Sequence, residues 1–315
     1  MPNPFLLNTS SRFPVIGQRR QCVICGYKIP QEDSPFSTAK VFCNVRAFQQ
    51  ESFTVWRCPD CQTIHSLEIV DLNFYYAEYP FAGATLNFPL RLCYQNLLQQ
   101  LTSNGFSPKH RFLDYGCANG LFIQYLQTQG FEHCHGYDPY ADPQGLGNPQ
   151  ILQQRFDYIL LQDVIEHVEI PQTLLVKLDQ LLKPGGYILI GTPNASHINL
   201  LESHRPNYYN SLHVPYHLHI YTPDVLIQLG ADRGWQVTQV FDRPFHDTHW
   251  FGLNSRAWNF YQALSDGTLN VIFEEIDVGL ALRSPRFWWY ALFGYWLSLK
   301  TDMAVLFHKP TLAVI

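Results

Sequence analysis

Residues 111–122 read RFLDYGCANGLF, and this stretch decides the fold. A short apolar run ends near Asp114, the small residues Gly116, Ala118 and Gly120 follow, and a second apolar run begins. This pattern is typical of a strand that turns into a helix, where small residues allow a ligand to approach the backbone. The glycine spacing fits neither the G-x-G-x-x-G dinucleotide turn nor the P-loop. We therefore expect a turn that receives an uncharged or cationic group beside the Asp114 carboxylate.

Strands and helices alternate around this turn. The apolar patterns predict strands at 109–116, 133–138, 156–164, 187–194, 235–241 and 302–310, and helices at 89–106, 121–130, 170–182 and 221–234. Pro171 and Pro223 stand at first helical positions, and Thr222 is the expected cap of the helix that closes at Gly234. Alternation of this kind indicates an α/β, Rossmann-like fold, in which a mostly parallel sheet has helices on both faces.

A second acid, Asp138, ends the strand that follows the turn. A carboxylate about 20 residues after such a turn can accept hydrogen bonds from both hydroxyls of a ribose. Together with a turn that lacks a phosphate-binding pattern, Asp138 predicts a nucleoside ligand without phosphates.

These motifs resemble those of the class I S-adenosylmethionine-dependent methyltransferases, whose first motif is D-x-G-x-G-x-G. Asp114, Gly116 and Gly120 match it, and Ala118 replaces the middle glycine. The segments QDVIEHV (162–168), LLKPGGYILIGTPN (181–194) and HLHIYTPDVLIQLGADRGW (217–235) are similar to later motifs of the same family.

The resemblance implies a seven-stranded sheet with S-adenosylmethionine as cofactor. Asp138 would hold the ribose, and the loop that contains Gly116, Cys117, Ala118 and Gly120 would lie against the amino-acid end of the cofactor. Gln162 and Asp163 would border the cofactor at the end of the fourth strand. The segment 142–157 is short where many relatives have a longer third strand, so the adenine partner stays unassigned, with Asp142 as a candidate.

Two C-x-x-C pairs, Cys22/Cys25 and Cys58/Cys61, lie near the start of the chain. Four thiolates on two tight turns match the ligand set of a closed, tetrahedral structural Zn²⁺ site. Cys43 and His65 are spare ligands, whereas Cys93, Cys117 and Cys134 are expected to be ordinary small apolar residues.

The amino-terminal half carries a narrower resemblance. Paired C-x-x-C knuckles are followed by D-x-x-x-Y-Y-x-x-Y, at Asp71, Tyr75, Tyr76 and Tyr79, as in bacterial zinc-ribbon methyltransferases. That group is associated with modification of sugars, surface glycans and natural products. The resemblance implies that the aromatic segment covers the cofactor pocket, although a packed interdomain linker explains it equally well.

We expect five segments along the chain. They are a zinc-ribbon module (1–70), an aromatic linker and helix (71–110), the S-adenosylmethionine-binding core (111–242), an aromatic helical insertion or lid (243–299) and the last core strand (300–315).

Histidines are the natural acid–base candidates near neutral pH. We predict that His167 acts as a base or positions the acceptor, with His213 and His217 as substrate contacts. Two alternatives stay open: the spacing of His213, His217 and His219 could bind a metal, and any one of these histidines could be a hydrogen-bonded structural residue.

The charge and hydropathy of the chain limit the kinds of binding partner that we expect. A net charge of -5 with scattered basic residues argues against a nucleic-acid partner. The first 20 residues lack the pattern of a secretory signal, and we expect a cytoplasmic protein. The apolar run at 287–299 is shorter than a membrane-spanning helix. It could contact a membrane surface or a lipid-linked substrate, line a pocket, or form a subunit contact.

The leading interpretation is a methyltransferase acting on a small molecule or glycan: a sugar, a nucleotide-sugar, a surface polysaccharide or a natural product. One alternative is an RNA methyltransferase guided by its zinc module. The other is a noncatalytic binding protein that retains the methyltransferase fold. Oxygen, nitrogen and carbon acceptors are all compatible with the sequence.

Overall fold

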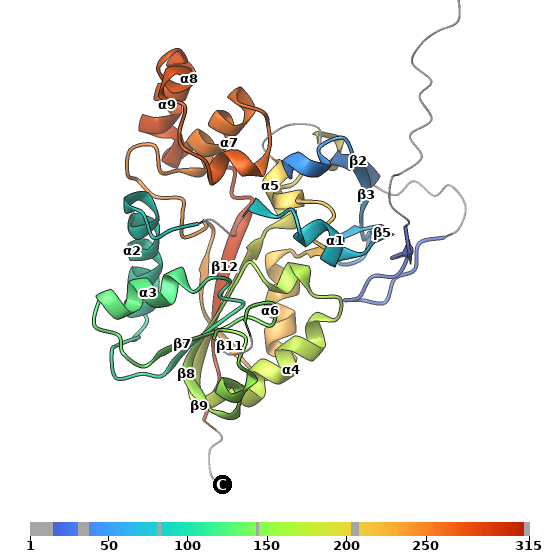
Figure 1. The fold of residues 1–315 in the computed structure, drawn as a ribbon. Coiled ribbons are helices and arrows are strands. Elements are labelled where there is room, and N and C mark those ends of the chain that lie inside the picture. The colour runs from blue at the N-terminus through green and yellow to red at the C-terminus, as the bar shows by residue number, and fades with distance from the viewer. Residues whose placement is uncertain (1–14, 31–37, 81–83, 143–144, 203–207, 312–315) are drawn as a thin grey trace, which may run out of the picture.

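The computed structural model describes residues 15–30, 38–80, 84–142, 145–202 and 208–311 (Figure 1). Its centre is a six-stranded sheet in the order β11-β12-β9-β8-β6-β7. The strands are β6 (Phe112–Tyr115), β7 (Cys134–Tyr137), β8 (Phe156–Gln162), β9 (Leu182–Pro193), β11 (Gln236–Phe241) and β12 (Asp302–His308). Strands β7, β6, β8 and β9 pair in parallel, whereas β12 runs antiparallel to both β9 and β11. The predicted fold class is confirmed.

Helices cover both faces of this sheet (Figure 1). On one face lie α2 (Phe88–Thr102) and α3 (Leu121–Thr128), and on the other lie α4 (Pro171–Leu181) and α6 (Pro223–Ala231). Successive side chains of a strand point to opposite faces of the sheet, so each strand contributes to an apolar layer on either side. Leu113 and Ile159 pack with α4 and α6, whereas Phe112 and Leu160 pack with α2 and α3. Each face of the sheet therefore buries its own apolar layer.

The local signals for the core helices are confirmed. Pro171 and Pro223 occupy first-turn positions of α4 and α6, and the amide of Val225 donates to Oγ1 of Thr222 at 3.3 Å. Residues 184–186 (PGG), which separate the predicted helix at 170–182 from the predicted strand at 187–194, instead lie within β9, where the register with β8 shifts and Gly185 has a φ of +79°.

The expected seventh strand is absent from the described part of the chain. Residues Pro149–Gln153 of the short segment before β8 form a 3-10 helix, η3, so the described sheet ends at β7. Prolines and glycines at 143, 145, 147 and 149 explain this difference, because they disfavour an interior strand. The sheet has six described strands rather than the seven that the resemblance implies.

The amino-terminal segment joins the core through a second sheet. Strands β2 (Thr38–Phe42), β3 (Ser52–Arg57) and β4 (Ile64–Ser66) form an antiparallel meander, and β10 (His219–Ile220) extends it. His219 pairs with His65 in this register. A smaller ribbon pairs β1 (Gly17–Gln18) with β5 (Glu68–Ile69). The sequence pattern did not indicate that a core segment completes the amino-terminal sheet.

The remaining helices lie at one end of the molecule or against the amino-terminal sheet (Figure 1). They are α1 (Leu72–Tyr76), α5 (Tyr209–Leu212), α7 (Ser255–Leu264), α8 (Val278–Leu282) and α9 (Pro285–Phe293). Helices α7, α8 and α9 lie between β11 and β12 in the chain. Within the described ranges, no helix combines the length and apolarity needed to cross a membrane.

Candidate active site

The turn between β6 and α3 has the left-handed backbone that its small residues suggest. Gly116, Ala118 and Gly120 have φ values of +83°, +48° and +72°. The amide of Gly116 donates to the carbonyl of Tyr137 at 2.7 Å, which ties the turn to the end of β7. An alanine with this φ costs about 1–2 kcal/mol. The turn therefore keeps its shape at Ala118 despite a backbone strain that glycine would relieve.

Asp138 holds this turn from the neighbouring strand. Its Oδ2 accepts from the amide of Ala118 at 3.0 Å, and its Oδ1 accepts from the amide of Tyr140 at 2.9 Å. Each carboxylate oxygen has a further lone pair, so the group can also accept two hydroxyl hydrogen bonds. The residues present therefore fit the ribose of the expected cofactor.

The Asp114 carboxylate lies at the end of β6 and is 6% exposed. Burial raises its pKa to about 7, and the charge of Asp138 adds to this effect. A cationic group brought to this turn would favour the ionised form of Asp114, because it offsets both causes.

Gln162 and Asp163 lie where the sequence places them, at the end of β8. Nε2 of Gln162 donates to Oδ1 of Asp163 at 3.0 Å, and the amide of Asp163 donates to the carbonyl of Gly191 in β9 at 3.0 Å. A Cβ atom on Gly191 would overlap the Gln162 side chain, and one on Gly116 would overlap Val164. The turn after β6 and the loop after β8 are thus packed closely together.

The aromatic segment around α1 connects the cofactor side to the histidines. The ring of Tyr76 stacks on Tyr140 with centroids 6.2 Å apart, and its hydroxyl lies 3.0 Å from Nδ1 of His167. The hydroxyl of Tyr79 lies 3.1 Å from Nε2 of His213. Asp71 caps α1, and the buried Tyr75 donates to Glu51 at 2.6 Å. Tyr76 therefore bridges the two sides of the site, while Tyr79 contacts the histidine side.

The structure brings His167, His213 and His217 together. The ring centroid of His217 lies 4.8 Å from that of His167 and 4.9 Å from that of His213. Both nitrogens of His213 are engaged, since Nδ1 lies 2.5 Å from Oδ1 of Asn44 and Nε2 faces Tyr79. Burial lowers the pKa of His167 to about 4 and that of His213 and His217 well below the usual value. All three rings are neutral at pH 7.

His219 does not join this group. Nδ1 of His219 lies 2.9 Å from Nδ1 of His65 in the amino-terminal sheet. Both ring nitrogens of His213 already have hydrogen-bond partners, so His213 has no nitrogen left to bind a metal. A metal site made of His213, His217 and His219 is therefore not formed.

Glu166 is an acid that the sequence places beside His167 at the pocket but to which it assigns no role. Its side chain is fully buried, and Oε2 accepts from the hydroxyl of Thr192 at 2.9 Å, while Oε1 has no hydrogen-bond partner in the described structure. Burial raises the pKa of Glu166 well above its usual value, and the charge of Asp163 adds to this. The available signal was its place in the motif QDVIEHV, directly before His167.

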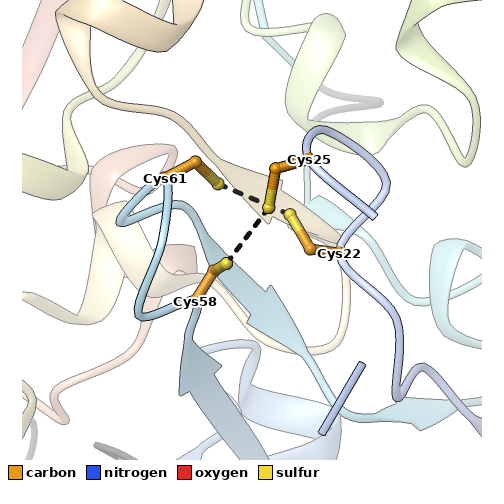
Figure 2. A group of neighbouring side chains, drawn as sticks. All are labelled: Cys22, Cys25, Cys58 and Cys61. Atoms are coloured by element: carbon orange, nitrogen blue, oxygen red, sulfur yellow. Dashed lines mark hydrogen bonds between the residues drawn. The ribbon is translucent and has the colours of Figure 1, made fainter. Parts of the chain in front are cut away.

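The four predicted cysteine ligands converge (Figure 2). Sγ of Cys22 lies 3.4 Å from Sγ of Cys61, and Sγ of Cys25 lies 3.5 Å from Sγ of Cys58. Tetrahedral zinc with Zn–S bonds of about 2.3 Å places its sulfurs about 3.8 Å apart. The shared hydrogen bond raises the pKa of Cys22 and lowers that of Cys61 to about 5. The cluster therefore fits a structural Zn²⁺ ion.

The spare ligands lie outside this cluster. Nε2 of His65 lies 3.2 Å from Sγ of Cys22, within hydrogen-bonding distance but outside the group of four thiols. The other cysteines, which are Cys43, Cys93, Cys117 and Cys134, are buried and form no disulfide. They pack as small apolar core residues do.

Comparison with known proteins supports a methyltransferase domain. Residues 89–240, just under half of the chain, match a family model described as a methyltransferase domain. The ubiquinone biosynthesis O-methyltransferase of Maricaulis maris is 35% identical over 104 residues, which cover 27% of this chain and 41% of that protein. The protein of the same name from Photorhabdus laumondii is 26% identical over 155 residues, which cover 43% of this chain and 62% of that protein. The chain thus spans roughly half the length of these curated relatives.

Solved structures give weaker likenesses. A phosphoethanolamine N-methyltransferase from Haemonchus contortus is 15% identical with a TM-score of 0.45, covering 90% of this chain and 72% of that one. A methyltransferase from Archaeoglobus fulgidus is 17% identical with a TM-score of 0.41, and the match covers 75% of this chain and 99% of that one. Residues 89–240 are thus similar to a methyltransferase domain, and the described sheet has the α/β architecture expected of one.

Proposed function

We propose that the protein transfers a methyl group from S-adenosylmethionine to a small molecule or glycan. The observation that carries this proposal is the Asp138 carboxylate, which lies on the amide of Ala118 at the end of two adjacent parallel strands. This hydrogen bond connects the end of β7, which we expect to hold the ribose of the cofactor, to the turn after β6, which we expect to hold its amino-acid part. The match of residues 89–240 to a methyltransferase domain supports the same activity.

The cofactor supplies a methyl group on a sulfonium, which is already a good leaving group. The chain must therefore mainly align the acceptor and exclude water. We assign cofactor binding to the backbone of Gly116, Cys117, Ala118 and Gly120, to Asp114 and Asp138, and to Gln162 and Asp163. Tyr76, which reaches from Tyr140 to His167, would close the space between cofactor and acceptor.

His167 is the residue we assign to the acceptor. Its Nδ1 lies 3.0 Å from the carbonyl oxygen of Tyr216, and this bond fixes the ring. A ring held in this way suits positioning of the acceptor. His217 would contact the acceptor beside it, while His213 would act through Tyr79 and Asn44.

We propose an oxygen on a small molecule as the acceptor. The curated relatives are named ubiquinone biosynthesis O-methyltransferases, which supports an oxygen acceptor. Sugars and natural products also carry hydroxyl groups, so the likeness to zinc-ribbon methyltransferases points to the same kind of acceptor atom. A cytoplasmic location suits the eight cysteines, all of which are free.

The helical insertion supports a lipid-linked form of this acceptor. Trp289, Leu292 and Trp296, on and after α9, are 56%, 54% and 66% exposed. Exposed tryptophan and leucine with nearby arginine, here Arg283 and Arg286, are typical of an interfacial contact with anionic lipid. Sedimentation with anionic vesicles tests this contact: we expect binding by the wild type and its loss in the Trp289→Ser/Trp296→Ser protein.

Transfer of labelled methyl from S-adenosylmethionine into a fractionated host lysate tests the activity itself. We expect label in a small-molecule, glycan or lipid-linked fraction with the wild type and none with Asp138→Ala. Label in RNA would favour an RNA methyltransferase instead. Cofactor binding without label in any fraction would favour a noncatalytic binding protein.

A further inference from the structure

We propose that Glu166, His167 and His217 hold a divalent metal ion beside the acceptor. One ligand atom from each residue lies within 4.8 Å of the other two, and the set is separate from the four cysteines. The statement about the acceptor rests on the proposed function, whereas the metal site rests on the geometry of these three side chains alone.

The two histidines present free lone pairs. Nδ1 of His167 lies 3.0 Å from the carbonyl oxygen of Tyr216, and Nδ1 of His217 lies 2.8 Å from that of Ser211. A carbonyl oxygen can only accept, so each Nδ1 carries the proton and each Nε2 is unprotonated. A backbone carbonyl that fixes the tautomer in this way is the usual support of a metal-binding histidine.

The third ligand atom is Oε1 of Glu166. It is fully buried without a hydrogen-bond partner among the described residues and lies 3.9 Å from Nε2 of His217. That distance is too long for a hydrogen bond. Metal–ligand bonds of about 2.0–2.2 Å would bring the two atoms to roughly 3–3.5 Å, so a small closure completes the site. Thr192 already holds Oε2 of Glu166, which directs Oε1 toward the histidines.

The charges around the site also favour a cation. The carboxylates of Asp163 and Asp302 act on Glu166 as like charges. Within the described chain, Glu166 forms no ion pair with lysine or arginine, and the imidazole of His217 that it faces is neutral. A buried carboxylate that faces two nitrogen lone pairs lacks a compensating charge, and a divalent cation would supply it.

Two imidazoles and one carboxylate form a ligand set used by Zn²⁺, Fe²⁺ and related ions with open positions for substrate. An acceptor hydroxyl that joined such an ion would lose its proton to solvent more readily. Its oxygen would then bond to the methyl carbon as the carbon–sulfur bond breaks, and S-adenosylhomocysteine would leave with the electron pair. The site thus specifies an acceptor with a hydroxyl, or two adjacent oxygens, that can bind a metal.

Cobalt binding to protein that holds a single zinc ion per chain, in the thiolate cluster, tests the site. With the thiolate cluster already filled, equilibrium dialysis should find one Co²⁺ per chain, with the visible bands of nitrogen and oxygen ligands and without thiolate charge-transfer bands. Glu166→Gln and His217→Gln should each weaken this binding at least about 10-fold. Glu169→Gln makes the same chemical change three residues away on an exposed side chain, and it should bind Co²⁺ as the wild type does.

Near-ultraviolet circular dichroism establishes that each variant is folded, and His167→Gln replaces any that is not. A folded wild type that takes up no Co²⁺ beyond the thiolate cluster overturns the proposal. So does unchanged binding in the folded variants. The measurement uses neither cofactor nor acceptor, so its failure is distinct from a failure of methyl transfer.

Discussion

The Nε2 atom of His65 lies 3.2 Å from the Sγ atom of Cys22, and both side chains are buried. Trp56 packs on the His65 ring with centroids 4.6 Å apart, and Nδ1 of His65 faces His219 at 2.9 Å. His65 therefore links the cysteine cluster to β10 of the core rather than serving as a fifth ligand. A zinc-bound thiolate at Cys22 would require the proton of His65 on Nε2.

Cys58→Ser should release zinc and unfold the amino-terminal module. Structural zinc contributes about 10–16 kcal/mol in small zinc-binding peptides, and Ser is a poor replacement for a thiolate. Metal analysis of the purified protein should fall from one zinc per chain to none. Cys134→Ser, which alters a buried cysteine of the core sheet, should keep its zinc. A fully folded wild type without zinc would refute this assignment.

His65→Gln should keep one zinc per chain but bind it more weakly, by about 10- to 100-fold, because only an outer hydrogen bond is lost. Competition with a chromophoric chelator measures the change. Complete loss of zinc from a folded His65→Gln protein would show that His65 is a ligand after all.

Gly116→Ala should destabilise the protein by about 2–5 kcal/mol, because left-handed backbone strain adds to overlap with Val164. Gly130 is the matched control: it also has a φ of +83°, but nothing lies within 4 Å of its missing Cβ. Gly130→Ala should therefore cost only the strain, about 1–2 kcal/mol. Urea unfolding measures both, and equal losses would contradict the close contact between the turn and Val164.

Asp114 should make stability depend on pH. Because its folded pKa is raised to about 7 from an ordinary value near 3.8, the folded state binds more protons than the unfolded state between these values. Stability from this group is present at low pH and is lost as pH rises toward 7. Between pH 5 and 8 the wild type should lose about 2–3 kcal/mol relative to Asp114→Asn in urea unfolding without cofactor. Parallel pH profiles of the two proteins would contradict the raised pKa.

The parts of the fold that follow from local pattern were predictable. Thr222 and Pro223 mark the start of α6 through a cap and a fixed φ, and both signals lie within one turn of helix. The cysteine cluster was also predictable, since C-x-x-C spacing alone places two sulfurs on one turn.

Features that depend on distant residues were not predictable in this way. The strand pair of His219 with His65 joins residues 154 positions apart, and no local pattern encodes it. The sequence places Glu166 next to His167 after the fourth strand, but only the fold shows that its side chain is buried against His217. The third strand was expected from resemblance to relatives, whereas the prolines and glycines of 142–157 decide the local structure.

Calorimetric titration with S-adenosylmethionine tests the central claim most directly. We expect one site per chain in the wild type and at least a 100-fold loss of affinity in Asp138→Ala, because the ribose hydroxyls and the amide of Ala118 lose their shared partner. Asp232→Asn, at the end of α6, should bind as the wild type does. A folded wild type that does not bind the cofactor, or an Asp138→Ala protein with undiminished affinity, would contradict the account.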